Sequence, residues 1–181
     1  MSVSFTAKDQ RLTRRCGRLV TFVAILLCTA GLGFSSVRAQ IAMSNGNYAQ
    51  DFNSLATGGT SNPWTDNSTL PGWYASRTSG GPAVTTYRAE SGTSTAGALC
   101  SLGSTASSER ALGSVASGTP GNFAYGVRFT NDTAITQTSI FISFTGEQWR
   151  NGGIAAQQTL AFSYRVSSSA ITDSDAANAN S

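Results

Sequence analysis

Three aromatic side chains stand out as residues that could bind a ligand. Trp64, Trp73 and Tyr74 fall within one long connection that also contains the turn dipeptide Pro71-Gly72. Flat rings on a loop can stack on the apolar face of a sugar or on a peptide. Tryptophan is mostly buried where a fold permits it, so our preferred interpretation is that these rings cap one end of a core. Carbohydrate stacking is the alternative.

Catalytic chemistry is restricted by the residue types that the chain lacks. It contains no histidine, which excludes Ser-His-Asp and Cys-His nucleophile systems and the zinc sites that need histidine. No glycine-rich phosphate loop follows a strand and opens a helix. Hydrolysis by a pair of carboxylates is the route that remains, because glycosidases place two carboxyl groups against the sugar.

The carboxylates after residue 39 do not form such a pair. No two of them alternate within a strand so as to face one way, and several lie near an arginine, which indicates structural pairing or solvation. Asp173-Ser174-Asp175 lacks the glycine and the closing glutamate of a calcium loop. The sequence therefore predicts no catalytic residue, no metal site and no cofactor. The carboxylates considered are Asp51, Asp66, Glu90, Glu109, Asp132, Glu147, Asp173 and Asp175.

Residues 1–39 have the three parts of a cleavable, helical secretory signal in the right order. A basic segment around Arg14 and Arg15 precedes an apolar stretch, and Val37 and Ala39 provide the small side chains that precede a cleavage site. The apolar stretch is shorter than the roughly 20 residues of a membrane span, which argues against a membrane anchor. We expect cleavage after Ala39 and a secreted or cell-surface product with no membrane span.

The positive charge of the chain belongs to this leader. The formal net charge is +3, yet residues 40–181 hold six arginines, eight carboxylates and no lysine. The processed chain is therefore mildly acidic and offers no basic patch to nucleic acid. Cys100 is its only cysteine. We prefer to interpret it as a small buried residue, and a disulfide to a cysteine beyond this chain is the alternative.

Alternation with a period of two predicts a β-rich domain. The clearest strand is Phe123–Phe129, because its large residues fall on one face. Leu160–Val166 repeats the pattern, and the more apolar Ile140–Phe144 is expected to be a central strand. Further strands are expected at Tyr48–Leu55, Val84–Ala89, Ala98–Leu102 and Arg110–Val115, with turns at Pro71-Gly72 and Asn151-Gly152-Gly153.

Antiparallel strands at such intervals indicate a jelly-roll-like β-sandwich, in which two sheets cover each other's apolar faces. A barrel is the lesser alternative. The domain is expected to span residues 48–172, between a polar lead-in at 40–47 and a polar tail at 173–181. Because no closing strand precedes the polar tail, we expect the sandwich to be incomplete.

Four stretches carry a resemblance to a known group of proteins: Tyr48–Leu55, Leu70–Tyr74, Ser108–Ser114 and Phe144–Arg150. Through them the chain resembles the N-terminal β-sandwich region of large secreted bacterial proteins. Such proteins often carry a PEP-CTERM-type sorting signal, a lamin-tail-like domain or an extracellular nuclease domain. The resemblance covers roughly residues 46–172 and implies the architecture and the compartment, but it transfers no catalytic motif.

The sequence thus predicts a non-catalytic extracellular module, structural or binding, with polysaccharide or cell-surface components as partners. Two alternatives stay open. The chain is an accessory domain of a secreted hydrolase or nuclease whose catalytic part lies elsewhere, or it is a carbohydrate-binding module that uses Trp64, Trp73 and Tyr74. The oligomeric state is not specified by the sequence. Unpaired edge strands lead us to expect poor solubility.

Overall fold

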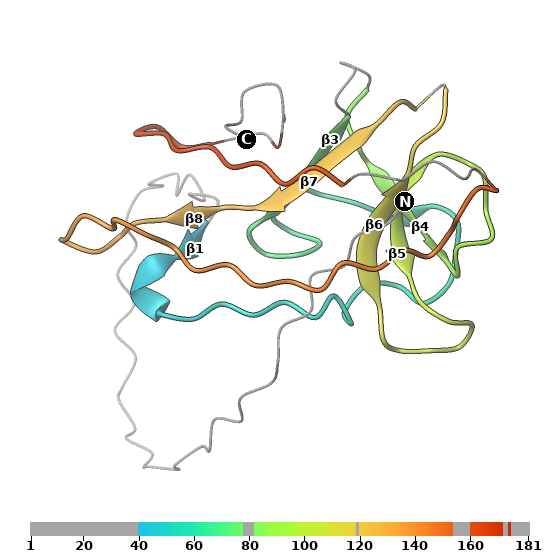
Figure 1. Cartoon of the computed structure of the whole chain (residues 1–181), viewed down its shortest axis with the longest axis horizontal. Helices are drawn as coiled ribbons and strands as arrows, with labels where there is room; N and C mark the ends of the chain where they lie inside the picture. The colour runs from blue at the N-terminus through green and yellow to red at the C-terminus, as the bar shows by residue number, and fades with distance from the viewer. Residues whose placement is uncertain (1–39, 78–81, 119, 154–159, 172–173, 175–181) are drawn as a thin grey trace, which may run out of the picture.

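The computed structural model describes residues 40–77, 82–118, 120–153, 160–171 and 174. This part of the chain is all-β, as predicted, and its short helix is a single 3-10 turn near the beginning. Figure 1 shows long connections between the strands. The elements are β1 (Ile41–Ala42), η1 (Met43–Asn45), β2 (Asn62–Pro63), β3 (Trp73–Arg77), β4 (Thr86–Glu90), β5 (Ala98–Leu102), β6 (Ala111–Val115), β7 (Phe123–Val127) and β8 (Phe129–Thr130).

Four of the predicted strands are confirmed with bounds close to those expected. The predicted strand Ala98–Leu102 is β5 itself, and β4, β6 and β7 lie at their predicted places. In β7 the large residues Phe123, Tyr125 and Val127 all pack against the main core, as their alternation predicts. The turn at Pro71-Gly72 is also present, with Gly72 at φ +80° directly before β3.

The strands form three sheets, in the orders β2-β4-β5-β6, β3-β7 and β1-β8. The antiparallel pairing that we expected holds for β2–β4, β5–β6 and β3–β7. It is wrong for β4–β5 and β1–β8, which are parallel. For β5 to run parallel to β4, the chain between them must return along the length of β4. The connection 91–97 can do so, because β4 has only five residues, each about 3.3 Å long.

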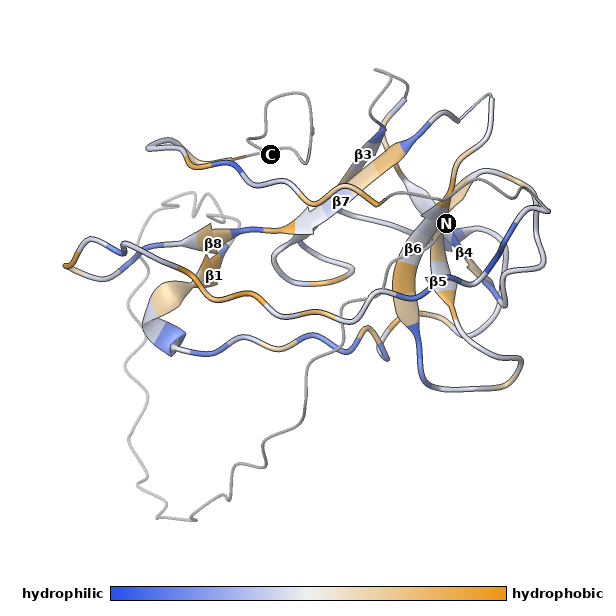
Figure 2. Ribbon diagram, viewed as in Figure 1, coloured by the Kyte–Doolittle hydropathy of each residue, from blue (hydrophilic) through white to orange (hydrophobic). Residues whose placement is uncertain are grey.

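One hydrophobic core joins the β3–β7 pair to the four-stranded sheet. Trp73 and Ala75 from β3 cluster with Tyr87, Leu99 and Leu112 from β4, β5 and β6. The connections contribute the other buried members, which are Phe52, Leu55, Trp64 and Leu70 before β3 and Val84 between β3 and β4. Figure 2 shows apolar residues along β5, β6 and β7, and also along the chain that follows β8. The complete jelly-roll-like sandwich stays a prediction.

The expected first strand, Tyr48–Leu55, is wrong. This stretch is an irregular loop with a turn, although it supplies two buried core residues. The Gln50 Oε1 atom accepts a hydrogen bond from the Phe52 N–H (2.9 Å), and the Asp51 Oδ1 atom accepts one from the Asn53 N–H (3.0 Å). These side chains take the place of a neighbouring strand, and Phe52 adopts φ 61°.

The two strands expected after β8 are also wrong. Ile140–Phe144, which we expected to be central, belongs to no sheet and is exposed. Leu160–Val166 contains a single bridge position, at Tyr164, and is largely exposed as well. Alternation sets which residues share a face, but a strand also needs a neighbouring backbone to pair with. The turn at Asn151-Gly152-Gly153 is present, with Gly153 at φ 74°.

Several predictions fall on residues outside the described part. The leader, residues 1–39, lies there entirely, as do Asp173 and Asp175 of the polar tail. Within the residues that are described, no helix has the length and apolar character needed to cross a membrane.

Candidate functional site

The three aromatic residues singled out in the sequence are all buried. Trp64 and Trp73 belong to the main core, and Tyr74 is 4% exposed. Each indole N–H is used within the chain, since Trp64 Nε1 donates to Asp66 Oδ1 (2.8 Å) and Trp73 Nε1 donates to Tyr48 Oη (2.7 Å). Figure 1 shows that β3, which carries Trp73 and Tyr74, lies beside β7.

Neighbouring groups cover the faces of these rings. Phe52 packs edge-on against Trp73 with ring centroids 4.9 Å apart, and Trp64 meets Tyr87 in the same way at 6.2 Å. The guanidinium of Arg128 lies over the Tyr74 ring. Stacking on a sugar requires an exposed ring face. The arrangement corresponds to the core-capping interpretation, so the trio supports no binding proposal.

A buried arginine that the sequence predicted only as the first residue of a strand organises the centre of the structure. Arg110, directly before β6, is 2% exposed. Its Nε donates to Ser101 Oγ (2.8 Å), and its Nη2 donates to the carbonyls of Ser101 and Glu90. Burial lowers the pKa of Arg110 from its ordinary value. A guanidinium stays protonated under physiological conditions nonetheless, so this is a buried charge held by hydrogen bonds.

The same arginine ties the irregular loop to the sheet. The Arg110 N–H donates to Asn53 Oδ1 (2.8 Å), and Ser101 Oγ donates to the carbonyl of Ala56 (2.9 Å). Space around the guanidinium is tight, because a Cβ at Gly103 would lie 2.3 Å from Arg110 Nη1. The Arg110 donors named here all point at groups of the chain itself. The hydrogen-bonded group of Arg110, Ser101 and Asn53 therefore has a structural role. In the sequence, the one indication of it is an arginine next to an apolar strand.

Cys100 is buried in β5, as our preferred interpretation held. Its Sγ lies 3.3 Å from the carbonyl of Ala98 and 3.5 Å from Glu90 Oε1. Burial first, and the neighbouring Glu90 carboxylate second, raise the pKa of the Cys100 thiol to about 12. The thiol therefore stays neutral at physiological pH and is a poor nucleophile.

The carboxylates serve the backbone and nearby side chains. Glu90 Oε2 accepts from the Ser94 N–H (3.0 Å), Asp66 Oδ1 from the Ala75 N–H (2.9 Å), and Glu147 Oε2 from Trp149 Nε1 (2.8 Å). Among the described residues no group of three or more His, Cys, Asp or Glu side chains is placed to hold a metal ion. A pocket of about 80 Å³ between Arg77 and Phe123 is small beside the roughly 300 Å³ of small-molecule sites.

The most unusual surface of the molecule lies after β8. We call residues 135–153 and 160–166 the apolar arm. All the exposed large hydrophobic residues of the described chain belong to it, with exposed fractions from 40% to 94%. They are Ile135, Ile140, Phe141, Ile142, Phe144, Leu160, Phe162, Tyr164 and Val166. A concentration of exposed large hydrophobic residues is unusual in soluble proteins and marks a candidate interaction site.

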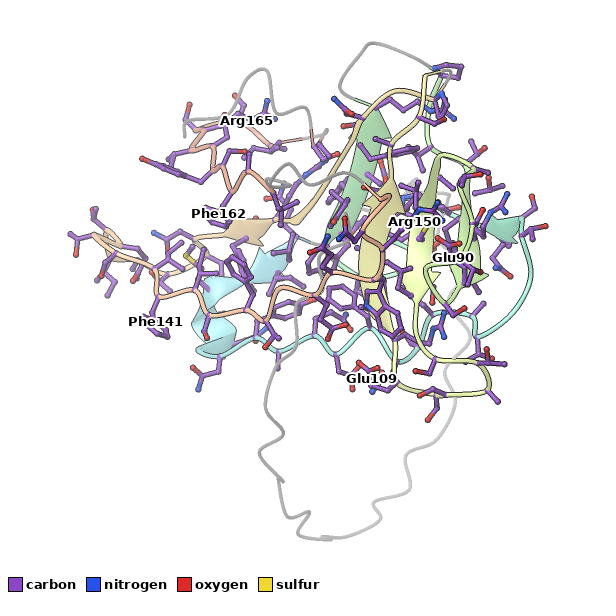
Figure 3. The ribbon with its side chains drawn as sticks, turned by 45° about the vertical axis from the view of Figure 1, so that its right-hand side comes forward. Glu90, Glu109, Phe141, Arg150, Phe162 and Arg165 are labelled. Carbon is purple, nitrogen blue, oxygen red and sulfur yellow. The ribbon has the colours of Figure 1, made fainter. Side chains whose placement is uncertain are left out.

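The arm contacts the folded region around Trp149 and Arg150. Trp149 packs on the face of β5 and β6 that carries Cys100, Leu102 and Ala111. Arg150 Nη1 donates to the carbonyl of Thr93 (2.9 Å) in the connection between β4 and β5. These contacts hold the middle of the arm against the sheet and leave the segments on either side of it exposed (Figure 3).

The two exposed segments of the arm touch each other. The rings of Phe144 and Phe162 are stacked, with centroids 5.9 Å apart and planes inclined by 16°. Figure 3 places Phe141 at the edge of the molecule and Phe162 on the same side of it. The sequence predicted strands of the sandwich at both segments, from the alternation in Leu160–Val166 and from the apolar character of Ile140–Phe144. The apolar arm is therefore the candidate functional surface.

Comparisons with family models, with curated proteins and with solved structures find no match to this chain.

Proposed function

We propose that this chain is a non-catalytic, exported interaction module that binds another protein through its apolar arm. The observation that carries the proposal is the concentration of exposed large hydrophobic side chains in the arm, against a region 40–130 that buries its own. Exposing so many apolar side chains to water is unfavourable by roughly 25 cal/mol per Å², so a partner that covers them gains that free energy. An apolar protein surface is the partner with matching chemistry.

Export is the part of this proposal that rests on the sequence. The basic segment, the apolar stretch and the small residues before Gln40 support cleavage by a signal peptidase and release outside the cytoplasm. The neutral, buried thiol of Cys100 is compatible with an oxidising compartment, since such a thiol does not react readily. A structural or binding role at the cell surface agrees with both features.

The test determines whether the full chain is exported and processed, and which molecule its arm contacts. The chain is produced in a bacterial host with a photo-reactive phenylalanine analogue at position 141, or at the exposed position 122 as the matched control. We expect an exported product that begins at Gln40 and forms a cross-linked protein adduct from position 141 only. The purified product is expected to leave polysaccharides and nucleic acids intact.

Three results contradict the proposal. An uncleaved chain retained in the cytoplasm overturns export. Defined turnover of a polysaccharide or a nucleic acid by the purified chain overturns the non-catalytic role. Equal cross-linking from positions 141 and 122 shows that the arm is no docking surface. The alternative of a carbohydrate-binding module gains no support from Trp64, Trp73 and Tyr74, because their rings are buried.

A further inference from the structure

We infer that the partner of the apolar arm is a second copy of this chain, with the two arms packed against each other about a twofold axis. This inference rests on the proposed function and names the occupant of the same surface. In such an arrangement each copy uses the same patch, so that every contact occurs twice. The size, charge and sequence pattern of the arm all favour this occupant.

The area of the arm fits a stable dimer. Nine large hydrophobic residues are exposed there, each by at least 40%. At roughly 150 Å² or more for a large apolar side chain, they present on the order of 800 Å² to solvent. That is about what each partner contributes to a standard protein interface. A short peptide covers far less of it than a second arm does.

The charge of the arm disfavours the other large partners. Residues 133–146 contain no charged side chain, and residues 40–181 contain no lysine. Anionic membranes and nucleic acids are bound by clusters of lysine and arginine. Of the two arginines in the arm, Arg150 is engaged with the carbonyls of Thr93 and Ser94. An apolar protein surface with few charges is therefore favoured, and the arm is itself such a surface.

The part of the arm up to Gly153 lies outside the sheets. None of residues 131–153 belongs to a strand, although Ile140–Phe144 has the composition of one. An extended segment of this kind can add to the same segment of a second chain as an antiparallel pair. The stacked Phe144 and Phe162 rings already bring the two segments of one arm together. Two arms then supply four extended segments, enough for a small sheet with an apolar face.

The test measures the oligomeric state of the exported, processed chain by analytical ultracentrifugation over a range of concentrations. We expect a reversible dimer. Phe141→Asp places a charge at the most exposed ring of the arm, and in the dimer the two charges lie buried close to one another. The dissociation constant is expected to rise by roughly 30-fold to 1,000-fold, as for an unpaired charge buried at an interface. Asn122→Asp adds the same charge at an exposed site outside the arm and is expected to leave the dimer unchanged.

A second variant, Val166→Asp, tests the other segment of the arm and is expected to weaken the dimer too. Unchanged circular dichroism of the variants separates loss of assembly from loss of folding. A parent chain that stays monomeric, or a dimer indifferent to both arm variants, overturns the inference. So does a monomer that sediments with neutral phosphatidylcholine vesicles through its arm. An exported, inactive monomer that cross-links to a different protein would contradict the inference that the partner is a second copy. It would leave the proposed function unaffected.

Discussion

Strand β7 and the segment Leu160–Val166 share one sequence pattern and have opposite surroundings. In β7 the alternate large residues pack against the main core, while β3 pairs with it along its full length. In Leu160–Val166 the alternate large residues are exposed, and only Tyr164 takes part in a bridge. Alternation thus determines which side chains share a face. A neighbouring backbone and a covering layer determine whether that face is buried.

The largest effect expected from this comparison is on stability. Phe52→Ala should lower the free energy of unfolding by about 3–5 kcal/mol, because it leaves a cavity beside Trp73. Phe141→Ala makes the same chemical change at a ring that is 94% exposed, and in dilute solution it should alter stability by no more than about 0.5 kcal/mol. Urea unfolding curves measure both. Equal losses would show that the arm is packed as firmly as the core.

The sequence predicted the strands of the core where local pattern and tertiary surroundings agree. Ala98–Leu102 is an example, because its apolar residues face clusters on both sides of the sheet. It did not predict the loop at Tyr48–Leu55. There the hydrogen bonds from Phe52 and Asn53 to the side chains of Gln50 and Asp51 outweigh the strand pattern.

The candidate surface was harder to predict than the fold. The hydrophobicity of Ile140–Phe144 indicates burial. No feature of the segment itself shows that the described chain leaves these side chains uncovered. The importance of Arg110 was hidden for a similar reason. Its partners include the carbonyl of Glu90 and the side chain of Asn53, which only the folded structure brings to it. Long-range packing decides both features.

A second comparison concerns thiol reactivity in the two regions. Raising the pKa of Cys100 to about 12 from the ordinary 9.0 should reduce its thiolate fraction about a thousandfold near neutral pH. Phe141→Cys, made in a Cys100→Ala background, places an ordinary thiol on the exposed arm. Alkylation by iodoacetamide on the dilute, processed chains is expected to be far slower at Cys100, because its thiolate fraction is smaller and its side chain is buried. Comparable rates would mean that β5 opens readily to solvent.

A third comparison separates backbone strain from docking of the arm. Gly92 (φ +84°) and Gly46 (φ +79°) both have a φ angle that L side chains rarely adopt, so an alanine is strained at either site. A Cβ at Gly92 would also lie 2.1 Å from the carbonyl oxygen of Trp149, whereas Gly46 has open space around it. We expect Gly92→Ala to release Trp149 and Gly46→Ala to leave it in place.

Acrylamide quenching of tryptophan fluorescence reports that release. Trp64 and Trp73 are buried, so any additional quenching in Gly92→Ala comes from Trp149. Identical quenching in the two variants would place Trp149 away from the connection between β4 and β5. The arm would then be attached to the core region elsewhere.

The smallest effect is expected at the join between the two regions. The Ser44 N–H donates to Asp132 Oδ1 (2.8 Å), and Ser44 Oγ donates to Asp132 Oδ2. These hydrogen bonds hold the pKa of Asp132 below its ordinary value of 3.8. Because the folded pKa is lowered, the contact stabilises the fold above that ordinary value and is lost as the pH falls through the lowered pKa.

An NMR titration of the Ser44 amide therefore should show its main shift below pH 3.8, and Asp132→Asn should abolish that shift. The effect on stability is expected to be slight, because the carboxylate is exposed. If the Ser44 amide instead followed an ordinary carboxyl titration, the Ser44–Asp132 hydrogen bonds would not form in solution. The contacts of Trp149 and Arg150 would then be the ones that hold the arm against the core region.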